Sequence, residues 1–219
     1  MKNIIAITIG LSVGLLASHL VFGQGTVYLS NLNQNFAGSF AVGSDSWQAP
    51  AFITGTNSGG YLLDSVQLGM ADASGSPIGF TVMICPDVVT TGDHPGSSLS
   101  TLIGSANPST VGSYNYTPTS ALALLPDTIY FIVISAGTSV ANGAYEWNYA
   151  DTQSYNPIDN WGGGGAFGSN NGLSWHLPGP PYYYPQYAIT ATAIPESSPA
   201  FLLLLGSGVL FYVHQRRST

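Results

Sequence analysis

The chain has 219 residues and a formal net charge of −7 at pH 7, from three Lys and Arg against ten Asp and Glu. All three cations lie near the chain ends, so residues 24–194 contain no Lys and no Arg. Proteins contact nucleic-acid phosphates through Lys and Arg, which excludes nucleic acid as a partner of this body. Cys85 is the single cysteine, so an intrachain disulfide is excluded as well.

The first 23 residues have the pattern of a secretory signal peptide. Lys2 supplies a positive start, and Ile4 to Leu16 form an apolar stretch before an exit that ends at Gly23. We expect cleavage after Gly23. A cut near Ala17–His19 and an uncleaved anchor are the alternatives.

Residues 24–194 have the length of one domain and are rich in Gly, Ser, Thr, Asn, Tyr and Val, with turn residues at short intervals. No long segment has the periodicity of a helix. The pattern predicts an all-β fold: an antiparallel β-sandwich of jelly-roll-like type, between an N-terminal signal helix and a C-terminal transmembrane helix. The expected strands are Phe36–Val42, Trp47–Thr54, Tyr61–Met70, Phe80–Cys85, Ser100–Gly104, Gly112–Thr117, Ala121–Leu125, Thr128–Ser135, Ala144–Tyr149 and Gln186–Ala193.

Several residues and segments indicate where strands lie in the sheet and where turns interrupt them. Pro50 should make its strand an edge strand or a bulged one. Asp64 interrupts an apolar face and should lie at a strand end. Asp72–Pro77 reads as a turn and Gly162–Gly165 as a flexible loop, whereas the near-continuously apolar run Thr128–Ser135 should be a central strand.

The residues available give little support to catalysis. A Ser or Cys nucleophile needs a histidine base, and the body has only His94 and His176. A glycoside hydrolase needs two facing carboxylates, for which Glu146 with Asp151 or Asp159 is the available pairing. Glu146 lies between two aromatic residues of an expected strand, so a solvated outward side chain is the simpler interpretation. We therefore expect a protein that is not an enzyme.

We expect no cofactor and no catalytic metal, because Cys85 is alone and no His-Glu-x-x-His motif is present. A structural Ca²⁺ is an alternative, since Asp72–Ser76 and Asp87–Asp93 offer hard oxygen ligands in turns. Neither segment has EF-hand spacing, and Asx-type turns explain both without an ion. Cys85 itself should be a small buried residue of a strand.

Carbohydrate binding is the alternative that specific residues support. Trp161, Trp175 and Tyr182–Tyr184, with Tyr183 at its centre, stand in segments rich in Gly, Asn and Pro, where exposed rings could stack on sugars. The other interpretation is that these rings cap the core of the sandwich.

The tail, residues 195–219, is apolar from Ala200 to Val213 and ends in a basic cluster. Fourteen residues of helix span roughly 21 Å at ~1.5 Å per residue, which is short of the ~30 Å hydrocarbon core. Extension towards the preceding residues and snorkelling of the basic side chains bring it closer to a membrane span. A buried core helix is the alternative.

The order of parts in this tail resembles a PEP-CTERM sorting signal, which has Pro-Glu-Pro, an apolar helix and an Arg cluster. The matching positions are Pro195, Glu196, the apolar run, Arg216 and Arg217, with Ser197 where the motif has its second Pro. The resemblance covers about the last 25 residues. It implies recognition by an exosortase-type membrane protease, removal of the tail, and release or attachment at the cell surface. A plain C-terminal anchor is the simpler alternative.

The body is similar to the choice-of-anchor R domains in several strand and turn patterns over most of Asn33–Ala193. These patterns are Gly38–Gly43, Leu62–Val66, Pro95–Leu99 and Leu125–Val133. The resemblance implies an exported bacterial surface domain and no particular activity.

Taken together, the sequence predicts an exported, non-enzymatic β-domain of the cell surface or extracellular matrix. It is anchored transiently in the membrane before processing, and its partners are the membrane and the sorting protease. The alternative is a carbohydrate-binding module that acts on a surface or matrix polysaccharide. A hydrolase is the third candidate.

Overall fold

The computed structural model describes residues 25–88 and 94–196. The predicted signal peptide, Asp93 and the tail beyond Glu196 lie outside these residues. The strands are β1 (Thr26–Ser30), β2 (Gly38–Val42), β3 (Trp47–Ile53), β4 (Tyr61–Gly75), β5 (Thr81–Pro86), β6 (Ser100–Gly104), β7 (Gly112–Pro118), β8 (Ala123–Leu124), β9 (Ile129–Ser135), β10 (Gly143–Ala150), β11 (Gly162–Ser169), β12 (Tyr184–Pro185) and β13 (Tyr187–Ala193), with one 3₁₀ turn, η1 (Val140–Asn142).

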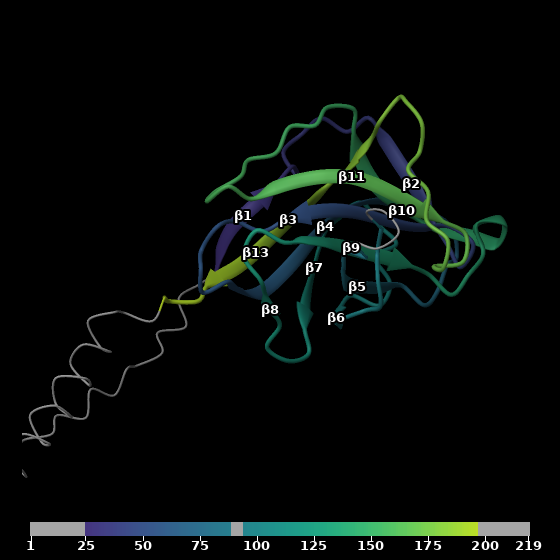
Figure 1. Ribbon diagram of the computed structural model, residues 1–219. Helices are drawn as coiled ribbons and strands as arrows, with labels where there is room; N and C mark the ends of the chain where they lie inside the picture. Colours follow the sequence, from purple (N-terminus) through teal and green to yellow (C-terminus); the bar gives the residue numbers. More distant parts are fainter. Residues whose placement is uncertain (1–24, 89–93, 197–219) are drawn as a thin grey trace, which may run out of the picture.

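Every strand pairing is antiparallel, which confirms the prediction of an all-β antiparallel fold (Figure 1). One path of paired strands runs β1-β13-β4-β7-β6-β5-β9-β3-β11, and a branch leaves β4 through β10 to β2 and β12. The paired strands therefore form one continuous sheet. The sheet curls until β2 and β12 approach β3 and β11 without pairing with them. We call this unpaired gap the seam.

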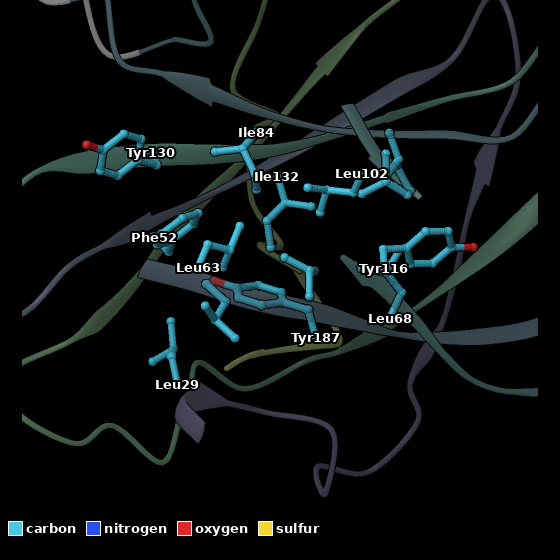
Figure 2. Close-up of a cluster of buried hydrophobic side chains, with 14 of the residues drawn as sticks. Leu29, Phe52, Leu63, Leu68, Ile84, Leu102, Tyr116, Tyr130, Ile132 and Tyr187 are labelled. Atoms are coloured by element: carbon cyan, nitrogen blue, oxygen red, sulfur yellow. The ribbon is translucent and has the colours of Figure 1, made fainter. Parts of the chain in front are cut away.

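Burial of apolar side chains on the inner face of the curled sheet explains its closure. Figure 2 shows Phe52, Ile132 and Tyr187 converging there from β3, β9 and β13, and each is fully buried. The predicted central strand is confirmed, because β9 lies between β5 and β3 and is buried along most of its length. Its continuous apolar run is explained by contacts on both faces.

A smaller apolar cluster covers the opposite face of the same strands. Cys85, Phe131 and Val133 are buried there with two alanines of β3. The prediction that Cys85 is a small buried residue is therefore confirmed. Burial raises the pKa of its thiol to about 12, because an apolar environment disfavours the charged form.

A β-bulge in β4 explains the unusual position of Asp64. The register of β4 against β13 shifts by one residue between Ser65 and Leu63, which leaves Asp64 as the extra residue. The shift changes which alternate side chains face the core, so that Leu63 is buried before the bulge and Val66 after it. Asp64 accepts a hydrogen bond from Thr192 Oγ1 at 2.8 Å. The expectation that it lies at a strand end is wrong.

Two segments expected to be irregular are strands. The expected turn Asp72–Pro77 is wrong over most of its length, because β4 continues to Gly75, where the backbone reaches φ 64°. Gly162–Gly165 is part of β11 and not a loop. Three of its glycines admit close neighbours, and a Cβ on Gly163 would come within 2.2 Å of the Tyr155 ring. Packing across the strand therefore replaces the side chains that glycine lacks.

Pro50 was expected to mark an edge or a bulge. The edge interpretation is wrong, since β3 lies between β9 and β11. A bulge does lie opposite Pro50, but its extra residue belongs to the neighbouring strand: three steps of β11, from Gly163 to Ala166, oppose two steps of β3, from Phe52 to Pro50.

The two ends of the described domain lie side by side. β1 pairs with β13, with Thr26 opposite Ala191, and the purple and yellow strands of Figure 1 run together to the same end of the molecule. Within residues 25–88 and 94–196, no helix has the length and apolar character needed to cross a membrane.

Candidate functional site

Trp161 lies in the interior of the protein and not on its surface. It is 2% exposed, stacks on Tyr28 at 5.1 Å and on Phe52 at 6.0 Å between ring centroids, and meets Tyr61 edge-on. We call these four rings the aromatic core cluster. The expectation that Trp161 is exposed for a ligand is therefore wrong, because strands and loops cover the ring on its flat faces.

Trp175 is half-buried and meets Trp47 edge-on, with ring centroids 6.5 Å apart. Both rings line a cavity of about 340 Å³, which Cys85 and Val133 of the smaller apolar cluster line as well. We call this cavity the tryptophan pocket. Trp175 is therefore accessible from solvent, whereas Trp161 is not.

Tyr183 lies in a second accessible pocket, at the seam. Its ring is 4.4 Å from that of Tyr149 and 6.5 Å from that of Phe40, and Phe40 and Tyr149 are themselves 4.7 Å apart. All three side chains are half-buried. The three expected ring contacts are thus in three places: one in the core and two in separate pockets.

The pocket around Tyr183 has a volume of about 220 Å³, and we call it the tyrosine pocket. β2 contributes Phe40, β3 contributes Gln48, and the segment 177–184 covers one side. Gln48 Nε2 donates to Ser46 Oγ at 3.4 Å, and Gln153 Nε2 donates to the Gly163 carbonyl at 3.2 Å. Of the described residues that line this pocket, none carries a charge.

The divergence of β2 and β3 creates this pocket. The two strands are joined by a tight connection with a bridge between Gly43 and Ser46. Beyond it β2 pairs with β10, whereas β3 pairs with β9 and β11. Gly38 makes room for Tyr149, which packs against Phe40 and Tyr183 of the pocket, since a Cβ on Gly38 would come within 2.3 Å of Tyr149 Oη.

The candidate catalytic carboxylates do not meet. Glu146 accepts a hydrogen bond from Ser39 Oγ at 2.7 Å on β10, whereas Asp159 accepts one from the Tyr61 hydroxyl beside the aromatic core cluster. Asp151 lies in the irregular segment after β10 and is exposed. The structure thus gives no pair of facing carboxylates among these three residues.

The described carboxylates of the segments considered for calcium, Asp72 and Asp87, accept hydrogen bonds from the backbone. Asp72 Oδ1 accepts a hydrogen bond from the Val111 N–H at 2.9 Å, and Asp87 Oδ1 accepts one from the His94 N–H at 3.1 Å. In the part of the chain that the structure describes, no three His, Cys, Asp or Glu side chains gather as a metal site would require.

Of the sorting-signal residues, Pro195 and Glu196 follow β13 as the last described residues. Ser197, Arg216 and Arg217 lie outside the described part of the chain.

Sequence reasoning missed Phe40 and both glutamines of the tyrosine pocket, and also Tyr149, whose ring packs against Phe40 and Tyr183. Tyr149 belongs to the expected strand Ala144–Tyr149, in which Tyr145 and Trp147 are fully buried whereas Tyr149 is half-buried. Tyr149 reaches the seam through the pairing of β2 with β10, which sets Gly38 opposite Tyr149. That pairing becomes known only from the fold.

The fold and the two pockets define an all-β domain with solvent-accessible aromatic side chains. No protein-family model and no curated protein matches the chain. The resemblances to a PEP-CTERM signal and to a choice-of-anchor R domain therefore stay predictions.

Proposed function

We propose that the protein is an exported β-domain of the cell surface or extracellular matrix, delivered by a C-terminal signal of the exosortase type. The observation that carries this proposal is the distribution of charge and apolar residues. Residues 24–194 have nine carboxylates and no Lys or Arg, and they lie between two apolar ends of which one closes on two arginines. A basic cluster after an apolar run favours retention of that end on the cytoplasmic side.

The geometry of the domain ends supports the same proposal. Because β1 and β13 pair, the signal segment and the tail leave the domain at one end. The tyrosine pocket lies towards the other end of the same strands: from Tyr184 to Ala193 the extended chain covers roughly 30 Å at about 3.3 Å per residue. A domain held by its tail would present this pocket away from the membrane.

The finer architecture belongs to the same proposal. We take the curled sheet to be a jelly-roll-like sandwich in which β4 takes part in both walls, since its early residues pair with β13 and its late residues with β10. A signal helix would precede it and a transmembrane helix would follow it.

Cell fractionation tests the proposal. The full chain and a variant that ends at Ile194 are expressed in a host with an exosortase-type protease, and both are followed in cytosol, membrane, surface and medium. The full chain should reach the surface, and the shortened chain should be exported but lost to the medium. Retention of both chains in the cytosol, with residues 1–23 still attached, would contradict the proposal.

A second candidate is a carbohydrate-binding module at the same location, as Trp175 and Tyr183 both line solvent-accessible pockets. Sugar recognition uses rings whose faces are open to the ligand, with polar groups at the rim. Affinity electrophoresis in gels containing soluble polysaccharides tests it. Retardation would support this candidate, and migration unaffected by every surface or matrix glycan would remove it.

A further inference from the structure

We propose that the tyrosine pocket binds one pyranose ring of an uncharged polysaccharide, with the ring held against Tyr183 and its hydroxyls met by Gln48 and Gln153. This inference rests on the second candidate function, carbohydrate binding, and assigns that function to one of the two pockets. It is independent of the route by which the protein is exported.

The size of the pocket favours a small ligand. Sites for drug-sized molecules have volumes of about 300–1,000 Å³, and this pocket has about 220 Å³. It is open on one side, where Leu177 and Tyr182 are half-exposed. A single sugar ring could therefore enter while the rest of a polysaccharide chain remains in solvent.

The aromatic wall supplies the apolar contact. Phe40 and Tyr183 line the pocket with their ring centroids 6.5 Å apart and their planes at 70°, and Tyr149 packs against both rings at 4.7 and 4.4 Å. Each ring retains surface that is not buried in the protein. Pyranose rings have an apolar face of axial C–H groups, and aromatic faces are the side-chain surfaces that match it.

The amides supply polar contacts of the kind that hydroxyl groups need. Gln48 and Gln153 each donate one hydrogen bond from Nε2 to the described part of the chain. An amide side chain has two N–H donors and a carbonyl oxygen that accepts, so each glutamine retains capacity for a ligand. Sugar hydroxyls both donate and accept hydrogen bonds, so a sugar can pair with both glutamine amides, whereas a purely apolar ligand cannot.

The charge of the site selects a neutral ligand. None of the described lining residues is charged, and the chain as a whole has a net charge of −7. Glu146 hydrogen-bonds Ser39, and the alternation of strand side chains directs both to the face of the β2–β10 pair opposite Phe40. A polyanion would be repelled by the field of the protein and would find no cation in the pocket. A quaternary ammonium group could use the rings but would leave the two amides without a role.

Affinity electrophoresis and fluorescence titration of the full chain in mild detergent test the inference. The probes are a soluble neutral α-glucan, a soluble neutral β-glucan, a neutral mannan, a polyuronate and choline. We expect binding to at least one neutral polysaccharide and none to the polyuronate or choline. Tyr183→Ala should weaken the Kd about tenfold or more, as expected for a central aromatic contact. Tyr183→Phe should bind within about threefold of the native chain, since the ring remains.

Trp175→Ala is the matched control, because it removes an aromatic ring from the other pocket. It should bind the neutral polysaccharide as the native chain does. Gln153→Ala is a second pocket variant on an exposed side chain, and it should weaken binding even where Tyr183→Ala fails to fold.

The contradicting outcomes are distinct. Binding lost in Trp175→Ala and kept in Tyr183→Ala and Gln153→Ala would move the sugar site to the tryptophan pocket and overturn this inference alone. Binding of choline or the polyuronate in place of the neutral polysaccharides would also overturn it. Failure to bind any of the neutral polysaccharides would remove both the inference and the second candidate function, and would leave the proposal of export untouched.

Discussion

The aromatic core cluster and the tyrosine pocket are built from the same kinds of side chain and differ in what covers them. Trp161 is enclosed by strands and by rings from β1, β3 and β4, and only 2% of its surface remains exposed. Tyr183 lies where β2 and β3 have diverged, so that no paired strand closes over it.

The difference teaches that the composition of a segment does not decide whether its aromatic residues are exposed. Trp161 and Tyr183 both stand beside Gly- or Pro-rich sequence. The distinction arises from strand pairing, since an aromatic ring is buried where the sheet is continuous and remains open where two strands separate. Substitutions in the two regions should therefore affect different properties.

The largest expected effect is on stability. Trp161→Ala removes a ring that is packed on three others, and it should lower the free energy of unfolding by about 3–5 kcal/mol. Tyr183→Ala should lower it by less, about 1–2 kcal/mol, because this ring is only half-buried. Urea unfolding followed by fluorescence and circular dichroism measures both. Equal losses in the two variants would remove the distinction between core and pocket.

The junction between the two regions depends on one buried amide. Asn31 is fully buried, its Nδ2 donates to the Pro185 carbonyl at 3.0 Å, and its Oδ1 accepts from the Tyr187 N–H at 2.8 Å. Asn31→Ala leaves two buried backbone groups without this partner and should lower the free energy of unfolding by about 1–3 kcal/mol.

Asn33→Ala is the control for this change, because Asn33 is exposed and should shift stability by about 0.5 kcal/mol or less. Urea midpoints of the two variants give the comparison. A neutral result for Asn31→Ala would mean that water or a shifted backbone satisfies both groups.

Alkaline pH should lower the free energy of unfolding through two tyrosines of the core whose hydroxyls are buried. Burial raises the pKa of Tyr155 to about 12 and raises the pKa of Tyr187 well above its ordinary value. The unfolded chain loses these protons near pH 10, before the folded chain does, so stability is complete below about pH 10 and falls as the pH rises towards 12. Each unit of pKa difference corresponds to about 1.4 kcal/mol.

Unfolding measured between pH 8 and 12, with tyrosinate absorbance recorded in parallel, tests this expectation. Tyr155→Phe removes one of the ionising hydroxyls and should lose less stability over the same range. A native chain whose stability is unchanged up to pH 12 would contradict the burial of these hydroxyls.

The smallest expected effect comes from the charge of the body. Nine carboxylates without Lys or Arg repel one another, and added salt screens that repulsion over about 10 Å at 0.1 M. The melting temperature should rise by about 1–2 °C between 0.01 and 0.15 M NaCl. A fall with salt would indicate that attractive charge pairs contribute to stability.

Much of the sheet could be predicted from local patterns. The apolar run Thr128–Ser135 gave β9, and the closing alternation Gln186–Ala193 gave β13, because side-chain burial in these strands follows the sequence directly. The prediction of a loop at Gly162–Gly165 was wrong because glycine has no side chain that could show the alternation of a strand. The Tyr155 ring that packs on this strand comes from another part of the chain. The prediction that Asp64 lies at a strand end was wrong because a single bulge changes the face of every residue after it.

The candidate site was only partly predictable. Tyr183 and Trp175 were among the rings considered for sugar contact, and each is half-buried and lines a pocket. Phe40 and Gln48 could not be assigned to the same site, because both belong to strands whose divergence follows from their separate partners, β10 and β9. The sequence identifies the aromatic residues, but the pairing of strands far apart in the chain determines which of them lie together.

The intact mass of the protein recovered from the cell surface tests the proposed export most directly. The account predicts a mass that lacks residues 1–23 and everything after about Pro195, since both apolar ends are expected to be removed on the way out. A full-length mass in the soluble cytosol, with neither end removed and none of the chain at the surface, would contradict it.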